Sequence, residues 1–211
     1  MQILKLDDGK TMQDIAAALS GPNPSQPDWA KDAGGPSVAA PGGVSNATQE
    51  FEPGNYAALC LIPSPDGVPH AAKGMVKPFT VTAAEGPAAQ APEPDVTISL
   101  KDFGFDVEGA KAGQHHVRVV NDCQQHHEVF MIKLAEGKML DDALAALEGS
   151  GPPGPPPFEI AGGLQGIMAG DSGQFSANWT PGRYALPCFL PDVNSGAPHI
   201  ALGMVKEIAV P

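Results

Sequence analysis

One order of residues occurs twice in this chain, once in each half. The stretch CLIPSPDGVPHAAKGM begins at Cys60, and CFLPDVNSGAPHIALGM begins at Cys188. The likeness reaches beyond these stretches, because MQILKLDDGKTMQDIAAAL at the start of the chain matches VFMIKLAEGKMLDDALAAL from Val129. The register is kept without a gap up to the two cysteines, and one inserted residue then aligns His70 with His199. Self-similarity at a fixed offset predicts two copies of one structural unit.

A segment rich in proline and alanine separates the two copies. It reads TAAEGPAAQAPEPD over residues 82–95 and is expected to be a semi-stiff, exposed linker. The second copy then covers residues 96–211. The first copy, residues 1–81, begins at the counterpart of Val129 and has nothing that matches residues 96–128. We therefore expect a partial domain that lacks its first strands, because the sequence is a fragment of a longer chain or because another chain supplies them.

The pattern of apolar residues in the second copy predicts a β-protein with one helix. Alternation predicts strands at residues 96–105, 115–121, 128–134, 173–179, 183–188 and 203–210. Helical spacing covers residues 139–147, and the Pro- and Gly-rich insert from Glu148 to Gly170 is expected to be a long loop over one end of the unit. The 25 glycines and 23 prolines favour short strands and turns. The predicted fold class is all-β: two tandem Greek-key β-sandwiches, each with one short helix in a long connection.

Charge and cysteine content exclude several classes of partner and scaffold. With 24 acidic against 12 basic residues, the net charge is −12, which repels phosphate backbones and anionic lipid. We therefore expect no nucleic-acid partner. The sequence has no apolar run of the roughly 20 residues that a membrane-spanning helix needs. Its three cysteines are too few for a disulfide scaffold.

The repeated residues are of types that bind copper. A thiol, an imidazole and a thioether follow one another in both copies. In the second copy they are Cys188, His199 and Met204, at the ends of two predicted strands. The loop NDCQQHHEV adds His127 at the start of a third predicted strand. Two imidazoles and a thiolate in a plane, with a weak thioether contact along the axis, suit both Cu(I) and Cu(II).

In this order of elements and residues, the second copy resembles a cupredoxin, the blue-copper fold of plastocyanin- and azurin-like proteins. The first copy resembles as much of that fold as is present. The resemblance implies a type 1 copper site of His127, Cys188, His199 and Met204, the last three from one loop between the last two strands. Ten residues separate Cys188 from His199, more than in plastocyanin-like proteins. In this length the loop is more similar to that of copper nitrite reductases. The resemblance also implies an exported electron-transfer protein or module, periplasmic, at the cell surface or secreted, with a protein redox partner.

The first copy carries Cys60, His70 and Met75 in the same order, but it has no counterpart of His127. These three residues define a second, incomplete site that another chain would have to complete. The absent strands would also leave unpaired sheet edges. We therefore expect an oligomer, or an assembly with other subunits, that covers these edges.

Other interpretations remain open. Cys123 lies four residues before His127, so it could form a disulfide with Cys188. The chain would then be a metal-free structural or interaction subunit of an extracytoplasmic assembly. A third interpretation is a copper-binding protein with a storage or delivery role. Within the site itself, His126 could replace His127, because a shift of one residue along a strand reverses the face to which a side chain points.

An enzymatic function is less favoured by the sequence than a carrier function, although the sequence does not decide between them. In multicopper oxidases and copper nitrite reductases, a histidine stands before the type 1 cysteine and connects it to a catalytic copper. Here Leu59 and Pro187 occupy that position, and neither side chain can bind a metal. The sequence also has no nucleophile elbow, zinc-protease motif or phosphate-binding loop.

Overall fold

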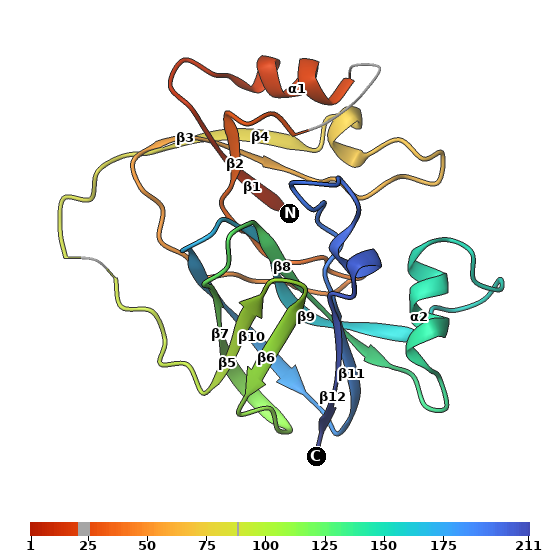
Figure 1. Ribbon diagram of the computed structural model, residues 1–211. Helices are drawn as coiled ribbons and strands as arrows, with labels where there is room; N and C mark the ends of the chain where they lie inside the picture. Colours follow the sequence, from red (N-terminus) through yellow and green to blue (C-terminus); the bar gives the residue numbers. More distant parts are fainter. Residues whose placement is uncertain (21–25, 88) are drawn as a thin grey trace.

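The computed structural model describes residues 1–20, 26–87 and 89–211 and consists mainly of β-strands (Figure 1). Ala88, in the predicted linker, lies outside the described residues. The strands are β1 (Gln2–Leu6), β2 (Ala30–Asp32), β3 (Gly54–Leu59), β4 (Val76–Val81), β5 (Val96–Lys101), β6 (Gly104–Glu108), β7 (Gly113–Asn121), β8 (His127–Leu134), β9 (Phe158–Ile167), β10 (Ser172–Trp179), β11 (Gly182–Pro187) and β12 (Val205–Val210). The α-helices are α1 (Met12–Ser20) and α2 (Leu140–Leu147), and the 3₁₀ helices are η1 (His70–Lys73) and η2 (His199–Leu202). The predicted all-β fold class is confirmed.

The second half of the chain forms a sandwich of two four-stranded sheets. One sheet has the order β10-β7-β5-β6 and the other β12-β11-β8-β9. Only the pairing of β5 with β7 is parallel among those described. Alternate side chains of both sheets, among them Ile98, Val119, Met131 and Trp179, meet in one buried apolar cluster. Because each fully buried side chain of this kind contributes about 1.5–3 kcal/mol, this cluster is the main source of the sandwich's stability.

Two of the predicted elements differ from the structure. Residues 96–105, predicted as one strand, form β5 and β6, because the chain turns back at Phe103, whose φ is 63°. The predicted loop from Glu148 to Gly170 contains β9, a ten-residue strand at the edge of its sheet. The sequence of this strand, FEIAGGLQGI, does not predict a strand, because it contains three glycines and glycine has a low β-propensity.

Gly163 is needed where β9 approaches β8. Its φ is 135°, and a Cβ atom added there would lie 2.0 Å from the carbonyl oxygen of Val129. We expect Gly163→Ala to lower the free energy of unfolding by about 3 kcal/mol or more, from backbone strain and the clash together. Gly170→Ala is the control, because its φ is 86° and its added Cβ meets nothing within 4 Å; it should cost only about 1 kcal/mol. Urea denaturation measures both values, and equal losses of unfolding free energy in the two variants would contradict the requirement for glycine at position 163.

The first half contributes one further sheet, with the order β2-β1-β3-β4. The second half has an equivalent sheet, in which β9, β8, β11 and β12 correspond in order to β2, β1, β3 and β4. Strand β3 begins 128 residues before β11, and β4 begins 129 residues before β12. Helix α1 covers one face of this sheet through Ile15, as α2 covers the outer face of the second-half sheet through Ala143 (Figure 1). The described part of residues 1–81 therefore has the architecture of one half of the sandwich.

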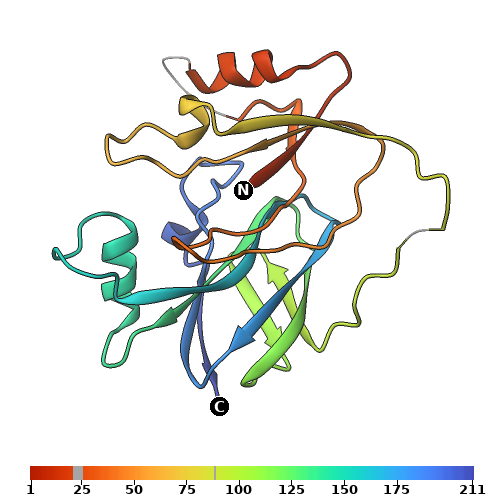
Figure 2. The same ribbon diagram turned by 180° about the vertical axis from the view of Figure 1, so that it is seen from behind.

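The segment between β2 and β3 runs along the open side of the sandwich, where β9 and β10 are the edge strands (Figure 2). Ala33 and Pro36 form bridges with β9, and Thr48 forms one with Gln174 of β10. Unpaired strand edges are a liability in β-proteins because they can pair with other chains. The first half of the chain thus covers two edges of the second.

Candidate metal centre

Three donor side chains converge at one end of the sandwich. His127 opens β8, Cys188 follows β11, and His199 opens η2. The His127 and His199 Nδ1 atoms are 3.1 Å apart, and the Cys188 Sγ is 3.4 Å from His199 Nδ1. All three donor atoms lie within 4.8 Å of one another, and the three residues are fully buried. Donors about 2.0–2.3 Å from one shared ion would stand about 3.5 Å apart, so these spacings fit a metal.

The backbone of the loop from Cys188 to Met204 brings its ends together. The Cys188 N–H donates to the Met204 carbonyl oxygen at 3.1 Å, and the Met204 N–H donates to the His199 carbonyl oxygen at 2.9 Å. Gly203 allows this turn with a φ of 97°. Met204 is fully buried in the same apolar cluster as Cys188. The structure therefore places the backbone of the fourth predicted ligand beside those of the other two on this loop.

Gln125 fixes the tautomer of His199. Its side-chain Oε1 accepts a hydrogen bond from the Val193 N–H at 3.1 Å, which settles the orientation of the amide. The same Oε1 lies 3.1 Å from His199 Nε2, so Nε2 must carry the hydrogen. The Nδ1 atom of His199 then presents its lone pair to Cys188 and His127.

Asp102 has the same effect on His127. Its Oδ1 lies 3.2 Å from His127 Nε2, and a carboxylate can only accept there. The hydrogen is therefore on Nε2, and the lone pair of Nδ1 points toward His199. Acceptors behind metal-binding histidines orient the rings in this way. Neither Gln125 nor Asp102 was predicted from the sequence, because each is polar and lies in a turn or loop without a recognisable motif.

The three donors are uncharged at neutral pH without a metal. Burial raises the pKa of the Cys188 thiol to about 12. Burial, together with the nearby His127 and His126 rings, lowers the pKa of His199 to about 4. Burial also lowers the pKa of His127, against the opposing effect of Asp102. Two lone pairs and a thiol thus face one another with no cationic side chain between them, which is the electrostatic setting of a cation site.

Glu128, the second residue of β8, connects this strand to the backbone next to Cys188. Its carboxylate accepts a hydrogen bond from the Phe189 N–H at 2.9 Å, directly after Cys188. Burial raises the pKa of Glu128 to about 7.

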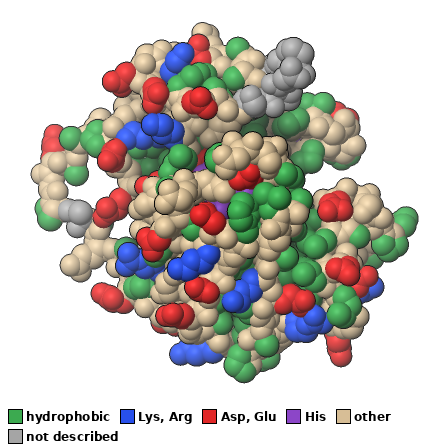
Figure 3. Space-filling view, in the orientation of Figure 1, with side chains coloured by type: hydrophobic (Ala, Val, Ile, Leu, Met, Phe, Trp, Pro, Cys, Tyr) green, Lys and Arg blue, Asp and Glu red, His purple; other side chains and the backbone are tan. Residues whose placement is uncertain are grey.

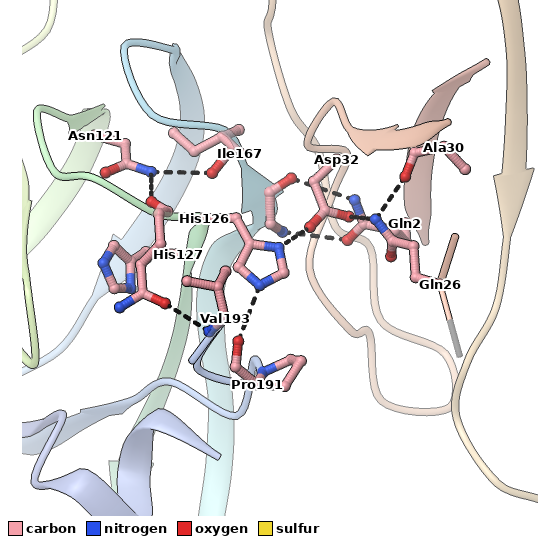
Figure 4. Close-up of polar contacts among 12 residues, drawn as sticks. Gln2, Gln26, Ala30, Asp32, Asn121, His126, His127, Ile167, Pro191 and Val193 are labelled. Atoms are coloured by element: carbon pink, nitrogen blue, oxygen red, sulfur yellow. Dashed lines mark hydrogen bonds and ion pairs between the residues drawn. The ribbon is translucent and has the colours of Figure 1, made fainter. Parts of the chain in front are cut away.

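Asn121 is fully buried and donates to the carbonyl oxygens of Gln125 and Ile167 (Figure 4). These two hydrogen bonds hold the loop before His127.

Two alternatives raised by the sequence are wrong. All three cysteines are free, and the Cys123 thiol donates to the Leu100 carbonyl oxygen at 2.9 Å, so Cys123 and Cys188 form no disulfide. His126 does not replace His127 in the donor cluster. Its Nδ1 lies 2.5 Å from Asp32 Oδ2, and its Nε2 lies 3.1 Å from the Pro191 carbonyl oxygen (Figure 4).

Asp32 belongs to the first half of the chain, so its contact with His126 joins the two halves. Both ring nitrogens of His126 face oxygen acceptors, an arrangement that favours the protonated ring. Burial alone would lower the pKa of His126, but the hydrogen bond and charge of Asp32 outweigh it and raise that pKa. The side chain of Gln2 adds a paired amide contact with Gly166, 3.2 Å in each direction.

The surface near the donors is partly apolar. Phe103 packs edge-on against the His199 ring, with 5.6 Å between ring centroids. Phe103 is itself exposed, as are Phe189, Val193 and Leu202 on or beside the ligand loop. Figure 3 shows a narrow strip of histidine surface near the middle of one face, with hydrophobic and acidic side chains around it.

The predicted residues of the first half also come together in part. Cys60 Sγ lies 3.6 Å from His70 Nδ1. Met75 is 47% exposed, unlike its fully buried counterpart Met204. Within the described residues, these side chains belong to no group of three or more histidine, cysteine or acidic donors.

Asp102→Ala tests the role of the acceptor behind His127. Without the carboxylate, the ring is free to rotate and change tautomer, and we expect copper affinity to fall about 10- to 100-fold. Asp102→Asn retains an acceptor oxygen and should recover most of that loss. The side chain of Asp102 is 42% exposed, so neither change should affect folding. Competition with a copper chelator measures both affinities; equal affinities for Asp102→Ala and the unchanged protein would contradict this role.

Comparisons with known proteins give only distant likenesses. No family model matches the sequence, and no curated protein does. Among solved structures, the dithionite-reduced auracyanin of Roseiflexus castenholzii shares 21% identity over 55% of this chain and 94% of its own, with a TM-score of 0.38. Auracyanin B shares 17% identity over 59% of this chain and 93% of its own, also with a TM-score of 0.38. Lac15 from a marine microbial metagenome shares 14% identity over 66% of this chain and 36% of its own, with a TM-score of 0.24.

All three TM-scores lie below 0.5. Among the described residues, no helix is long and apolar enough to cross a membrane.

Proposed function

We propose that the second half of the chain binds one copper ion in a type 1, cupredoxin-like centre and carries single electrons. One observation supports this most: the buried thiol of Cys188 and the Nδ1 atoms of His127 and His199 face one another, and both rings are oriented by acceptors behind them. Two imidazoles and one thiolate are the equatorial ligands of such a centre. Met204, buried beside Cys188, is the proposed axial ligand.

The positions of the proposed ligands along the chain support the cupredoxin resemblance. The first histidine opens a strand, and the other three residues lie on one loop between the last two strands, β11 and β12. We further propose that the two halves are copies of this unit, with residues 1–81 a partial copy, 82–95 a linker and 96–211 a complete one. The common strand order and the constant offset of β3 and β4 support this interpretation.

A bound copper ion would supply a reversible one-electron couple. The side chains of this chain would hold the ion and shield it. Cys188 would lose its proton to the solvent on binding, Gln125 and Asp102 would keep the two rings in place, and the buried setting would exclude water. Small rearrangement of a fixed ligand set is what an electron carrier needs.

The proposed partner is a protein that exchanges electrons through the apolar surface around His199. Phe103, Val193 and Leu202 are exposed there, and aromatic and aliphatic side chains form the cores of protein interfaces. The net charge of −12 favours a partner with a basic surface. We place the protein outside the cytoplasm, in the periplasm, at the cell surface or secreted, as the cupredoxin resemblance implies.

An optical titration tests the proposal. Adding Cu(II) to the metal-free protein should produce an intense visible band from charge transfer between the Cys188 thiolate and copper. The band should reach its maximum at one ion per chain and should disappear on addition of ascorbate. A protein that binds copper but stays colourless would contradict a type 1 centre.

A further inference from the structure

The loop of the first half repeats the backbone of the ligand loop bond for bond. The Cys60 N–H donates to the Met75 carbonyl oxygen at 3.1 Å, and the Met75 N–H donates to that of His70 at 2.9 Å. The His70 N–H donates to the Ile62 carbonyl oxygen at 2.9 Å, and the Ala71 N–H to that of Cys60 at 2.8 Å. The four equivalent bonds of the second half have lengths of 3.1, 2.9, 2.8 and 2.8 Å. The first loop is therefore built to the same plan as the second.

The side chains on this loop form a pair rather than a closed cluster. Cys60 is buried, and its Sγ lies 3.6 Å from His70 Nδ1, close to the 3.4 Å between Cys188 and His199. His70 is half-buried, and Met75 is exposed. The described residues offer no further histidine, cysteine or acidic donor that would close a group of three. An ion held by this pair would stay open to ligands from outside.

The donor types select the ion. A thiolate, an imidazole and a nearby thioether are soft or borderline ligands, and soft sulfur donors favour Cu(I). Cu(I) accepts low coordination numbers, whereas structural Zn²⁺ requires four ligands. The exposed side chains nearest the pair in the sequence, Leu61, Ile62 and Val68, are apolar, and the carboxylate of Asp66 on the same loop is paired with Lys73 at 2.7 Å.

We propose that Cys60 and His70 form a second, coordinatively open site for Cu(I), with Met75 as the additional donor on the same loop. Binding breaks the Cys60 S–H bond, releases the proton to the solvent and forms a sulfur–copper bond, while the copper remains Cu(I). The inference depends only on the first half of the chain and not on the electron-transfer centre. An ion in an open site is accessible to an incoming ligand, so this site suits copper uptake or transfer.

Anaerobic titration of the metal-free chain with Cu(I), in competition with a chromogenic Cu(I) chelator, tests this site. We expect the unchanged protein to bind two ions. Cys60→Ser should bind one ion fewer, and His70→Gln should bind the second ion at least about tenfold more weakly, because one of two preset donors is lost. Cys123→Ser is the matched control and should bind as many ions as the unchanged protein, since a serine hydroxyl can still donate to the Leu100 carbonyl oxygen.

The two proposals fail in different ways. Cys188→Ser should lose the visible band of the Cu(II) protein but keep the Cu(I) ion that Cys60 holds. Equal Cu(I) binding by Cys60→Ser and the unchanged protein would overturn the second site and leave the first intact. A measurement on the unchanged protein covers the case in which Cys60→Ser does not fold. In protein with ¹⁵N-labelled histidine, Cu(I) should shift the ring signals of His70, and unchanged signals at two equivalents would also overturn the proposal.

Discussion

Cys188→Ser is expected to abolish the visible absorption of the copper-loaded protein completely. The band requires a thiolate bound to copper, and Cys188 is the only sulfur in the His127–Cys188–His199 donor group found among the described residues. A serine hydroxyl is a hard, weakly acidic donor that gives no such transition. Visible spectra of the two proteins, with copper measured on the same samples, check this result.

Cys123→Ser is the matched control for that experiment, because Cys123 is a free thiol that also lies within reach of His127, in a second donor group with Asp102, and its hydrogen is directed at the Leu100 carbonyl oxygen. It should retain the full absorption. Loss of the band in Cys123→Ser, or its survival in Cys188→Ser, would show that the copper is bound by a different thiol.

Asp32→Ala is expected to destabilise the whole chain and not only the first half. Asp32 is 3% exposed and accepts hydrogen bonds from His126 and Gln26. Removing it leaves the half-buried His126 ring and the Gln26 amide without their acceptor, and a loss of this kind costs about 1–3 kcal/mol. His126 also holds the Pro191 carbonyl oxygen on the ligand loop, so we expect the metal centre to loosen as well.

Urea denaturation of the metal-free protein measures this loss. Glu52→Gln is the control, because Glu52 forms an ion pair with Lys5 in the same half but is 82% exposed. Exposed pairs contribute about 0–1 kcal/mol. If both variants lose the same small amount, the contact between Asp32 and His126 does not join the two halves.

The sequence was sufficient for the parts of the fold that depend on regular patterns. The recurring order of residues predicted β11 and β12 and their counterparts β3 and β4, because alternation and turn residues recur in both halves of the chain. Strand β9 could not be found, since its glycines are selected by close approaches that only the folded chain contains, such as that of Gly163 to β8 and that of Gly162 to Phe175 of β10. The turn at Phe103 was missed although the pattern marks it: apolar residues at 96, 98 and 100 are followed by two polar residues, Lys101 and Asp102, which break the alternation. The positive φ of Phe103 itself leaves no trace in the pattern.

Some residues of the candidate site could likewise be predicted from the sequence, and others could not. The order of His127, Cys188 and His199 pointed to one cluster, and the structure brings their donor atoms together. The acceptors behind the rings could not be predicted, because Gln125 and Asp102 acquire their roles only from distances set by loop geometry. The disulfide alternative was wrong because the Cys123 thiol is turned toward the backbone of β5. The contact of Asp32 with His126 depends on how the two halves pack, which no local pattern encodes.

A crystal structure of the copper-loaded protein, with the ion located by its anomalous scattering, tests the central claim most directly. We predict one copper ion about 2.0–2.3 Å from Cys188 Sγ and from the Nδ1 atoms of His127 and His199. A copper ion bound elsewhere, with these three atoms still facing one another and empty between them, would contradict the proposed centre.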